Sequence, residues 1–165
     1  MCVVAVVVMG VSGSGKTSVA LLVAEAVGGR VVDADDLHPE ANVAKMAAGT
    51  PLTDDDRWPW LESVAAAMRL DDGSPVVVAC SALRRAYRDV LRTGDDEVRF
   101  VLLDVPRALL EQRLTRRKGH FMPATLLDSQ LSTLEPLGDG DEGVVVDASG
   151  PPEQTAAAVL QALSR

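Results

Sequence analysis

The pattern that most constrains the fold is the segment of residues 10–17, which reads Gly-Val-Ser-Gly-Ser-Gly-Lys-Thr. It matches G-x-x-x-x-G-K-[ST] at every fixed position, and it follows a Val-rich run at residues 3–9. Glycines let such a loop close around a phosphate with successive N–H groups pointing inward, and a following helix adds partial positive charge. The segment therefore predicts a buried strand, a phosphate-binding loop and a helix.

Short Val-rich runs alternate with helical patterns along the rest of the chain. Strands are predicted at residues 3–9, 30–32, 75–79, 98–103 and 143–146. Apolar stripes at helical spacing are formed by Val19, Leu22, Val23, Ala26 and Val27, by Leu61, Val64, Ala65 and Met68, and by Ala156, Val159, Leu160 and Leu163. This alternation predicts an α/β three-layer sandwich of the P-loop NTPase type, with a five-stranded parallel sheet, as one domain over residues 1–165.

Composition and charge exclude several classes of protein. The net charge of −8 disfavours binding to nucleic acid or anionic membranes, because phosphate groups repel such a surface. The apolar run at residues 3–9 is too short to span a bilayer. Two cysteines are too few for a disulfide framework, so we expect a reduced, cytoplasmic protein.

A phosphate loop alone does not distinguish kinases from guanine-nucleotide switches. Switch proteins of the Ras type carry a D-x-x-G element followed by N/T-K-x-D, and no N/T-K-x-D occurs in this chain. Its single D-x-x-G, at residues 147–150, belongs to the last predicted strand and so stands in the wrong order. A guanine-nucleotide switch is therefore disfavoured.

Two carboxylates, Asp33 and Asp35, stand one residue apart where the second predicted strand ends. Side chains in this relation can point to the same side, so one can address a metal while the other takes a proton from an acceptor hydroxyl. A solvated acidic turn, or a helix N-cap near Pro39, is the alternative interpretation, and Asp36 fits that alternative best.

A further helix is predicted to begin after Thr53, since Thr53 and Asp56 have the spacing of a capping box. Pro59 then has to lie in the first turn of that helix. Trp58 and Trp60 are expected in the core. Arg57 is the residue of this segment that we assign to function, as a clamp for a carboxylate or phosphate.

Basic residues gather in two short stretches on this acidic chain. They are Arg84, Arg85, Arg88 and Arg92, and then Arg113, Arg116, Arg117 and Lys118. Such clusters suggest a local anion site. For Arg85, Arg88 and Arg92 we favour the simpler interpretation of a solvated helix face.

Several motifs together resemble the gluconokinase family, within the shikimate and adenylate kinase group. They are GVSGSGKT, D-x-D followed by LHP, N-x-x-K-M, G-x-P-L-x-D-D-D-R-x-P-W-L, CSAL-R-x-x-Y-R-D-x-L-R and R-K-G-H-F, and they cover most of residues 8–136. A shikimate kinase would be expected to show a glycine triplet where this chain has Cys80-Ser81-Ala82-Leu83. The resemblance implies transfer of a phosphoryl group from Mg²⁺-bound ATP to gluconate, a mobile lid over about residues 113–124, and a homodimer.

The resemblance also implies roles for individual residues. Catalytic roles fall to Lys16, Asp35 and Arg117, and metal binding to Thr17 and Asp33. Nucleotide binding falls to Gly10, Val11, Ser12, Gly13, Ser14, Gly15, Lys16, Thr17, Ser18 and Arg113. Independently of the resemblance, the loop of residues 147–152 after the last predicted strand is interpreted as an adenine platform, and the alternative is that these residues start a helix. Acceptor binding falls to Asp35, His38, Lys45, Arg57, Ser81, Arg84 and His120.

Each acceptor residue has a structural alternative. His38 could cap a helix, Lys45 could lie on a solvated face, and Ser81 could cap a helix starting at Ala82. Two alternatives for the whole chain also stay open. One is a kinase for shikimate or another small hydroxy acid, and the other is an ATP-binding regulatory protein without turnover.

Overall fold

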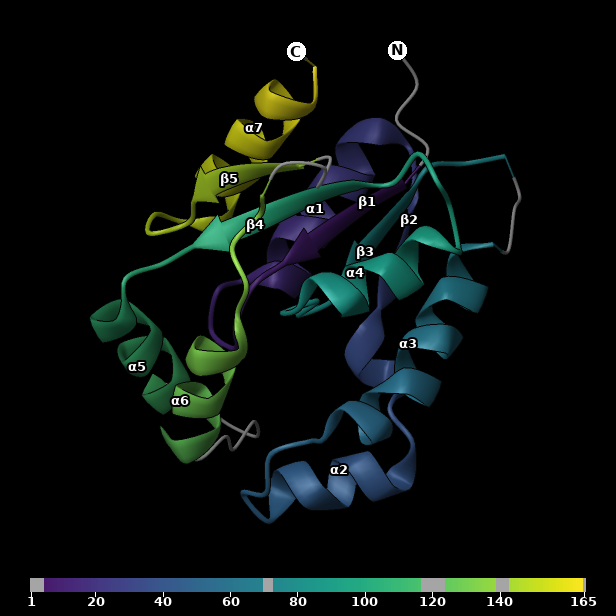
Figure 1. Cartoon of the computed structure of the whole chain (residues 1–165). Helices are drawn as coiled ribbons and strands as arrows, with labels where there is room; N and C mark the ends of the chain where they lie inside the picture. Colours follow the sequence, from purple (N-terminus) through teal and green to yellow (C-terminus); the bar gives the residue numbers. More distant parts are fainter. Residues whose placement is uncertain (1–4, 70–72, 117–123, 139–142, 165) are drawn as a thin grey trace.

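A single five-stranded parallel sheet forms the centre of the computed structural model, which describes residues 5–69, 73–116, 124–138 and 143–164 (Figure 1). Its strands are β1 (Ala5–Met9), β2 (Arg30–Asp33), β3 (Val76–Ala79), β4 (Arg99–Asp104) and β5 (Gly143–Asp147). Their order across the sheet is β2-β3-β1-β4-β5, and every neighbouring pair is parallel. The predicted α/β class and the five predicted strands are confirmed.

Helices cover both faces of this sheet and extend beyond one of its ends. They are α1 (Lys16–Val27), the 3₁₀ helix η1 (Ala34–Leu37), α2 (Glu40–Ala47), α3 (Asp54–Met68), α4 (Arg85–Arg92), α5 (Arg107–Arg116), α6 (Ala124–Thr133) and α7 (Pro152–Leu163). Helices α1 and α7 pack together on one face, and α3 and α4 on the other (Figure 1). Helices α2, α5 and α6 lie beyond the carboxyl ends of the strands (Figure 1). No helix in the described part of the chain is long and apolar enough to cross a membrane.

The core is built from small and branched side chains of the central strands, with all five residues of β1 buried. The stripe predicted for α3 is buried as expected. On α1 the predicted stripe is partly wrong, because Val19, Ala20, Val23 and Ala24 are buried while Val27 is 37% exposed. Two alanines on the buried face let α1 approach β3 and α7 closely, and this rotates the contact face away from Val27.

The capping box that starts α3 is confirmed. The Thr53 hydroxyl accepts a hydrogen bond from the Asp56 N–H, and the Asp56 carboxylate accepts one from the Thr53 N–H. Because the box begins the helix at Asp54, Pro59 lies inside the helix, and its predicted place in the first turn is wrong. An interior proline costs a helix about 3 kcal/mol. The buried residues Trp60 and Leu61, directly after it, provide the packing that offsets this cost.

The predicted solvated face of α4 is wrong for Arg88. Its side chain is fully buried, and its guanidinium donates hydrogen bonds to the carbonyl oxygens of Ala82, Glu135 and Pro136. Ala82 has a φ of 45°, a left-handed conformation that is costly for a residue with a Cβ. Arg88 therefore joins the loop after β3 to the segment after α6. Arg85, on the same helix, is exposed as predicted.

Replacing Arg88 with methionine is expected to lower the free energy of unfolding by about 3 kcal/mol, because buried carbonyl groups lose a charged donor. Urea unfolding followed by circular dichroism measures this change. Arg85→Met, which removes the same charge from an exposed position of α4, is the control and should change stability by less than about 0.5 kcal/mol. Equal stability of the two variants would contradict the structural role of Arg88.

Candidate active site

The phosphate loop occupies the turn between β1 and α1. Gly10, Gly13 and Gly15 have φ angles of 148°, 87° and 93°, a range that favours glycine. A Cβ on Gly10 would lie 2.8 Å from the Ser14 hydroxyl oxygen, so this position has no room for a side chain. The buried Ser14 hydroxyl in turn donates to the Val11 carbonyl oxygen at 2.7 Å and fixes the curvature of the loop.

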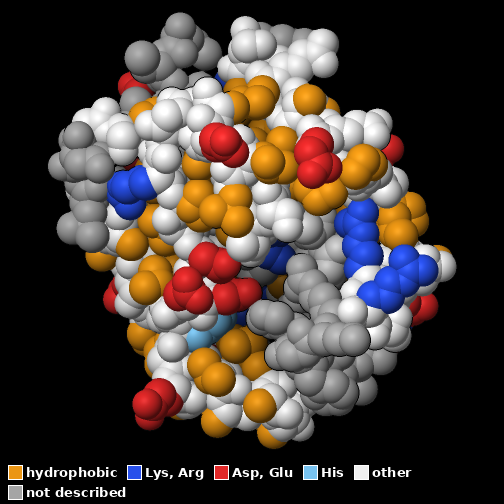
Figure 2. All heavy atoms as spheres, turned by 180° about the vertical axis from the view of Figure 1, so that it is seen from behind, with side chains coloured by type: hydrophobic (Ala, Val, Ile, Leu, Met, Phe, Trp, Pro, Cys, Tyr) orange, Lys and Arg blue, Asp and Glu red, His pale blue; other side chains and the backbone are white. Residues whose placement is uncertain are grey.

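Two cavities meet at this loop. The first, of about 290 Å³, is lined by residues that include Ser12, Lys16, Asp35, His38, Arg57 and Ser81. The second, also about 290 Å³, is lined by residues that include Gly13, Ser14, Gly15, Arg113, Ala148 and Gly150. Figure 2 shows a hollowed face of the molecule with acidic and histidine side chains beside the hollow. A group bound by the loop is therefore accessible from two separate compartments.

The predicted metal ligands are in contact. The Thr17 hydroxyl donates to Asp33 Oδ2 at 3.0 Å, and Asp33 Oδ1 accepts from the backbone N–H of Asp35 at 3.0 Å. The second bond makes Asp33 the N-cap of η1, so the strand end and the 3₁₀ helix together orient its carboxylate. A hydroxyl and a carboxylate are hard oxygen ligands, and Mg²⁺ is commonly bound by one or two such groups together with phosphate oxygens and water. These residues fit Mg²⁺.

Four of the predicted acceptor residues line the first cavity together with Lys16. Asp35 comes from η1, His38 from the residue that follows it, Arg57 from α3, and Ser81 from the loop after β3. The Ser81 carbonyl accepts from the N–H of Gly10 at 3.3 Å, which draws its loop against the phosphate loop. Because α4 begins at Arg85, the alternative that Ser81 caps a helix starting at Ala82 is wrong.

His38 lies flat against Trp60, with ring centroids 4.0 Å apart and an angle of 15° between the planes. Burial lowers the pKa of His38, Asp35 opposes that shift by its negative charge, and Arg57 adds to it. Trp60 is in the core, as predicted, and also forms part of the cavity wall. The histidine is therefore held mainly neutral at neutral pH, despite the carboxylate beside it.

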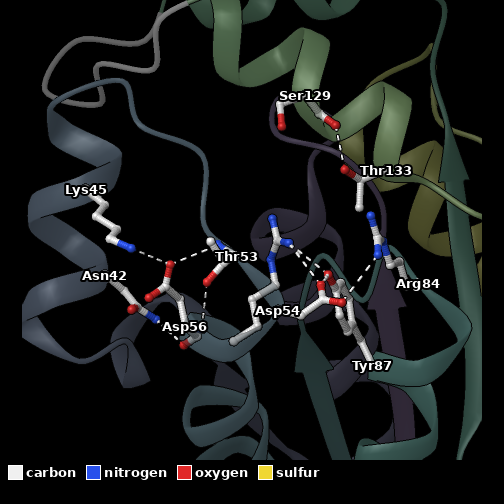
Figure 3. Close-up of polar contacts among 10 residues, drawn as sticks. Asn42, Lys45, Thr53, Asp54, Asp56, Arg84, Tyr87, Ser129 and Thr133 are labelled. Carbon is white, nitrogen blue, oxygen red and sulfur yellow. Dashed lines mark hydrogen bonds and ion pairs between the residues drawn. The ribbon is translucent and has the colours of Figure 1, made fainter.

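Lys45 lies outside the residues that line the first cavity. Its ammonium group forms an ion pair with Asp56 Oδ2 at 2.7 Å, across the junction between α2 and α3 (Figure 3). This contact, with the hydrogen bond from Thr53, lowers the pKa of Asp56 to about 2. Lys45 thus forms a defined ion pair instead of lying on a solvated face without a partner. The role of Lys45 in binding an acceptor stays a prediction.

Arg84 lines an adjoining cavity of about 460 Å³, whose wall includes Arg57. Its guanidinium lies 3.4 Å from Asp54 Oδ2, and the guanidinium of Arg57 lies 3.8 Å from Asp54 Oδ1 (Figure 3). The Tyr87 hydroxyl also donates to Asp54 and accepts from Arg57. Burial and the bond to Asp54 raise the pKa of Tyr87. Asp54 and Tyr87 therefore fix the two arginines.

The sequence interpretation missed some of these residues. Asp54 and Tyr87 stand in the sequence only as positions of the family motifs quoted above, which assign them no role. Gln130 on α6 also belongs to the site, because its Oε1 accepts a hydrogen bond from the N–H of Ser12 in the phosphate loop at 2.7 Å and its side chain lines the first cavity. No local pattern distinguishes Gln130 from a surface glutamine, because its partner is 118 residues away in the chain.

Arg113 lies where the second cavity meets the phosphate loop. Its guanidinium donates to the carbonyl oxygens of Gly13 and Ser14 and to those of Ala148 and Gly150. It thereby joins α5 to the loop after β5, the segment predicted as an adenine platform. The predicted site residues Arg117 and His120 lie outside the described residues.

Comparison with known proteins supports the motifs quoted above. The family model AAA_33, described as an AAA domain, matches residues 6–137. A gluconokinase from Gluconobacter oxydans (strain 621H) is 52% identical over 141 residues, which cover 84% of this chain and 79% of the relative. The thermoresistant gluconokinase of Escherichia coli (strain K12) is 42% identical over 163 residues, covering 96% and 93%.

The solved structures agree with the sequence relatives. The crystal structure of a gluconokinase from Sinorhizobium meliloti 1021 matches with a TM-score of 0.88 at 47% identity, covering 98% of this chain and 92% of that one. Identity at this level over nearly whole chains extends well beyond the phosphate loop that many enzymes share. On its sequence, its fold and the two cavities that meet at its phosphate loop, the chain belongs to the gluconokinase family of P-loop kinases.

Proposed function

We propose that this protein transfers the γ-phosphoryl group of ATP to the 6-hydroxyl of D-gluconate, giving 6-phospho-D-gluconate and ADP. The observation that carries the proposal is the position of the phosphate loop between two cavities, with Lys16 and Asp35 in the wall of the first. A nucleotide in the second cavity would present its terminal phosphate to an acceptor in the first. The family relationship supports gluconate as that acceptor.

The residues of the first cavity supply the groups that this transfer needs. Asp35 would orient the acceptor hydroxyl and take its proton as the new O–P bond forms and the bond to the leaving ADP oxygen breaks. Lys16 and the N–H groups of the loop would neutralise charge on the transferring group. The Lys16 ammonium donates to the Val11 carbonyl oxygen at 3.1 Å, which holds it at the loop.

The shape and charge of the acceptor side suit a polyol that carries one carboxylate. Ser81, His38 and Asp35 offer hydrogen-bonding groups for hydroxyls. Besides Lys16 at the phosphate loop, positive charge is supplied by Arg57 and, in the adjoining cavity, by Arg84. Gluconate in this orientation would place its carboxylate near the arginines and its 6-hydroxyl near Asp35. The ion pairs of both arginines with Asp54 support this orientation, because they hold the two guanidinium groups beside one another.

Four further parts of the proposal rest mainly on the family resemblance. Thr17 and Asp33 would hold Mg²⁺, which when bound neutralises phosphate charge. Residues 113–124 would act as a lid carrying Arg117, and Arg113 would support the adenine side. The protein would be a homodimer, which light scattering after size-exclusion chromatography tests. It would work in a reducing cytoplasm, in agreement with the free, buried thiol of Cys80.

The test is the release of ADP from Mg-ATP with D-gluconate, shikimate, glucose, other aldonates, AMP or no acceptor. Rapid turnover with gluconate alone, with 6-phospho-D-gluconate identified as the product, is the expected result. Turnover with a different acceptor would overturn the substrate and keep the phosphotransferase. ATP binding without turnover on any acceptor would favour a regulatory ATP-binding protein.

A further inference from the structure

His38 is held from two directions by buried residues. One face of its ring stacks on Trp60, whose indole N–H donates to the Ala34 carbonyl oxygen at 2.7 Å. The edge of the ring faces Asn42 on α2, where Asn42 Nδ2 lies 3.3 Å from His38 Nδ1. Asn42 is only 3% exposed, which is unusual for an amide side chain. The ring plane and one ring nitrogen are therefore fixed.

The orientation of the Asn42 amide is determined by a second contact. The same Nδ2 lies 2.9 Å from the backbone carbonyl oxygen of Asp56, at the start of α3 (Figure 3). A carbonyl oxygen can only accept, so the atom of Asn42 that faces it must be the nitrogen. The amide group has two hydrogens, one for the carbonyl and one for the ring. Nδ1 of His38 is therefore the acceptor of this pair.

An imidazole whose Nδ1 accepts a hydrogen bond is neutral and carries its proton on Nε2. The charged groups around His38 do not favour a second proton strongly enough to change this state. Asp35 on η1 favours it, Arg57 on α3 opposes it, and Lys16 of α1 lines the same cavity with a further positive charge. The fixed acceptor role of Nδ1 and the burial of the ring both favour the neutral form.

We propose that Asn42 is a positioning residue that holds His38 as its neutral Nε2–H tautomer, so that His38 offers an uncharged hydrogen-bond donor to a hydroxyl of the acceptor. This proposal rests on the proposed function only in taking a polyol as that acceptor. An imidazolium beside Lys16 and Arg57 would place a third positive charge on this cavity and would favour a phosphorylated product over its neutral hydroxyl precursor. A neutral donor avoids that bias.

The first test is the ¹⁵N NMR spectrum of ¹⁵N-histidine-labelled protein at pH 7.5 without ligands. The chain contains two histidines, so His120→Gln assigns the signals of His38. We expect Nδ1 of His38 to have the chemical shift of an unprotonated nitrogen and Nε2 that of a protonated one. A proton on Nδ1, or a charged ring, in the wild-type protein would overturn the proposal, and this measurement needs no variant at Asn42.

The second test replaces the amide of Asn42, which donates to His38, with a carboxylate, which can only accept. In Asn42→Asp a carboxylate faces Nδ1, so the proton should move to Nδ1 and the pKa of His38 should rise, because an acceptor and a negative charge both favour a proton there. Thr53→Ala is the matched control, because it disturbs the same α2–α3 junction through the capping box without touching the ring. The control should keep the wild-type histidine spectrum. An unchanged spectrum in folded Asn42→Asp would contradict the proposal.

Kinetics distinguish this proposal from the proposed function. In Asn42→Asp the KM for gluconate should rise about tenfold at pH 7.5, the equivalent of one misdirected hydrogen bond, with a smaller change in kcat. The KM for ATP should stay the same. If the wild-type protein does not phosphorylate gluconate, the proposed function fails, while the tautomer measured by NMR still decides the role of Asn42.

Discussion

Asp35→Asn is expected to lower kcat for gluconate by a factor of about 10³, within the range that a positioned general base contributes. Asparagine keeps the size of the side chain and cannot take a proton. The backbone N–H of Asp35, which donates to Asp33, is unchanged by the substitution, so the metal ligands should keep their geometry. The KM for ATP should therefore stay close to that of the wild type. Steady-state ADP release measures both constants.

Asp36→Asn is the matched control for this variant. Asp36 is the next residue of η1, is exposed, and lies outside the residues that line the first cavity. The substitution removes the same charge a few ångströms away, so a general change in potential would lower kcat in both variants. Equal losses in Asp35→Asn and Asp36→Asn would show that Asp35 acts through its charge alone and not as the base.

Lys16→Ala is expected to reduce kcat by a factor of about 10² to 10³, the cost of removing one preorganised donor from a developing charge. The ammonium group is held at the phosphate loop by the Val11 carbonyl and lies in the wall of the first cavity. Its loss should also raise the KM for ATP, because the terminal phosphates lose a cation in both the ground state and the transition state.

Arg85→Gln is the control for Lys16→Ala, since it removes a positive charge from an exposed position away from both cavities. Its kcat and KM should match those of the wild type. Retained kcat in Lys16→Ala would mean that charge on the transferring phosphoryl is neutralised elsewhere. That result would contradict the role proposed for Lys16, even with gluconate confirmed as the acceptor.

The two cavities give these predictions a common physical basis. Ser12 and Lys16 belong to the wall of the first cavity, and Gly13, Ser14 and Gly15 to that of the second. The loop is therefore the partition across which a phosphoryl group would pass. Gln130 holds this partition from α6 and Arg113 holds it from the last turns of α5, where the predicted lid begins. Movement of these helices would therefore also change the conformation of the phosphate loop.

Local sequence was sufficient for features whose physical cause lies within a few residues. The glycines of the phosphate loop and the capping box of Thr53 and Asp56 both depend on neighbours in the chain. The Val-rich strands were predictable for the same reason, since both faces of a parallel sheet are buried and each run is apolar throughout. The predicted position of Pro59 in the first turn of α3 was wrong, because the packing of the helix outweighed the local rule against an interior proline.

Tertiary structure decided the features that depend on partners far along the chain. The sequence pattern of α4 predicts Arg88 as a surface residue. Its burial is possible because residues 135 and 136, far along the chain, supply carbonyl groups that accept its hydrogen bonds. The orientation of the Asn42 amide likewise depends on the carbonyl group of Asp56, which α3 brings to the nitrogen that also faces His38. The phosphate-binding loop and the α/β class were thus predictable from the residues alone, because each depends on a pattern within short segments of the chain. The orientation and protonation of the acceptor groups required the folded chain, because burial and hydrogen-bond partners exist only there.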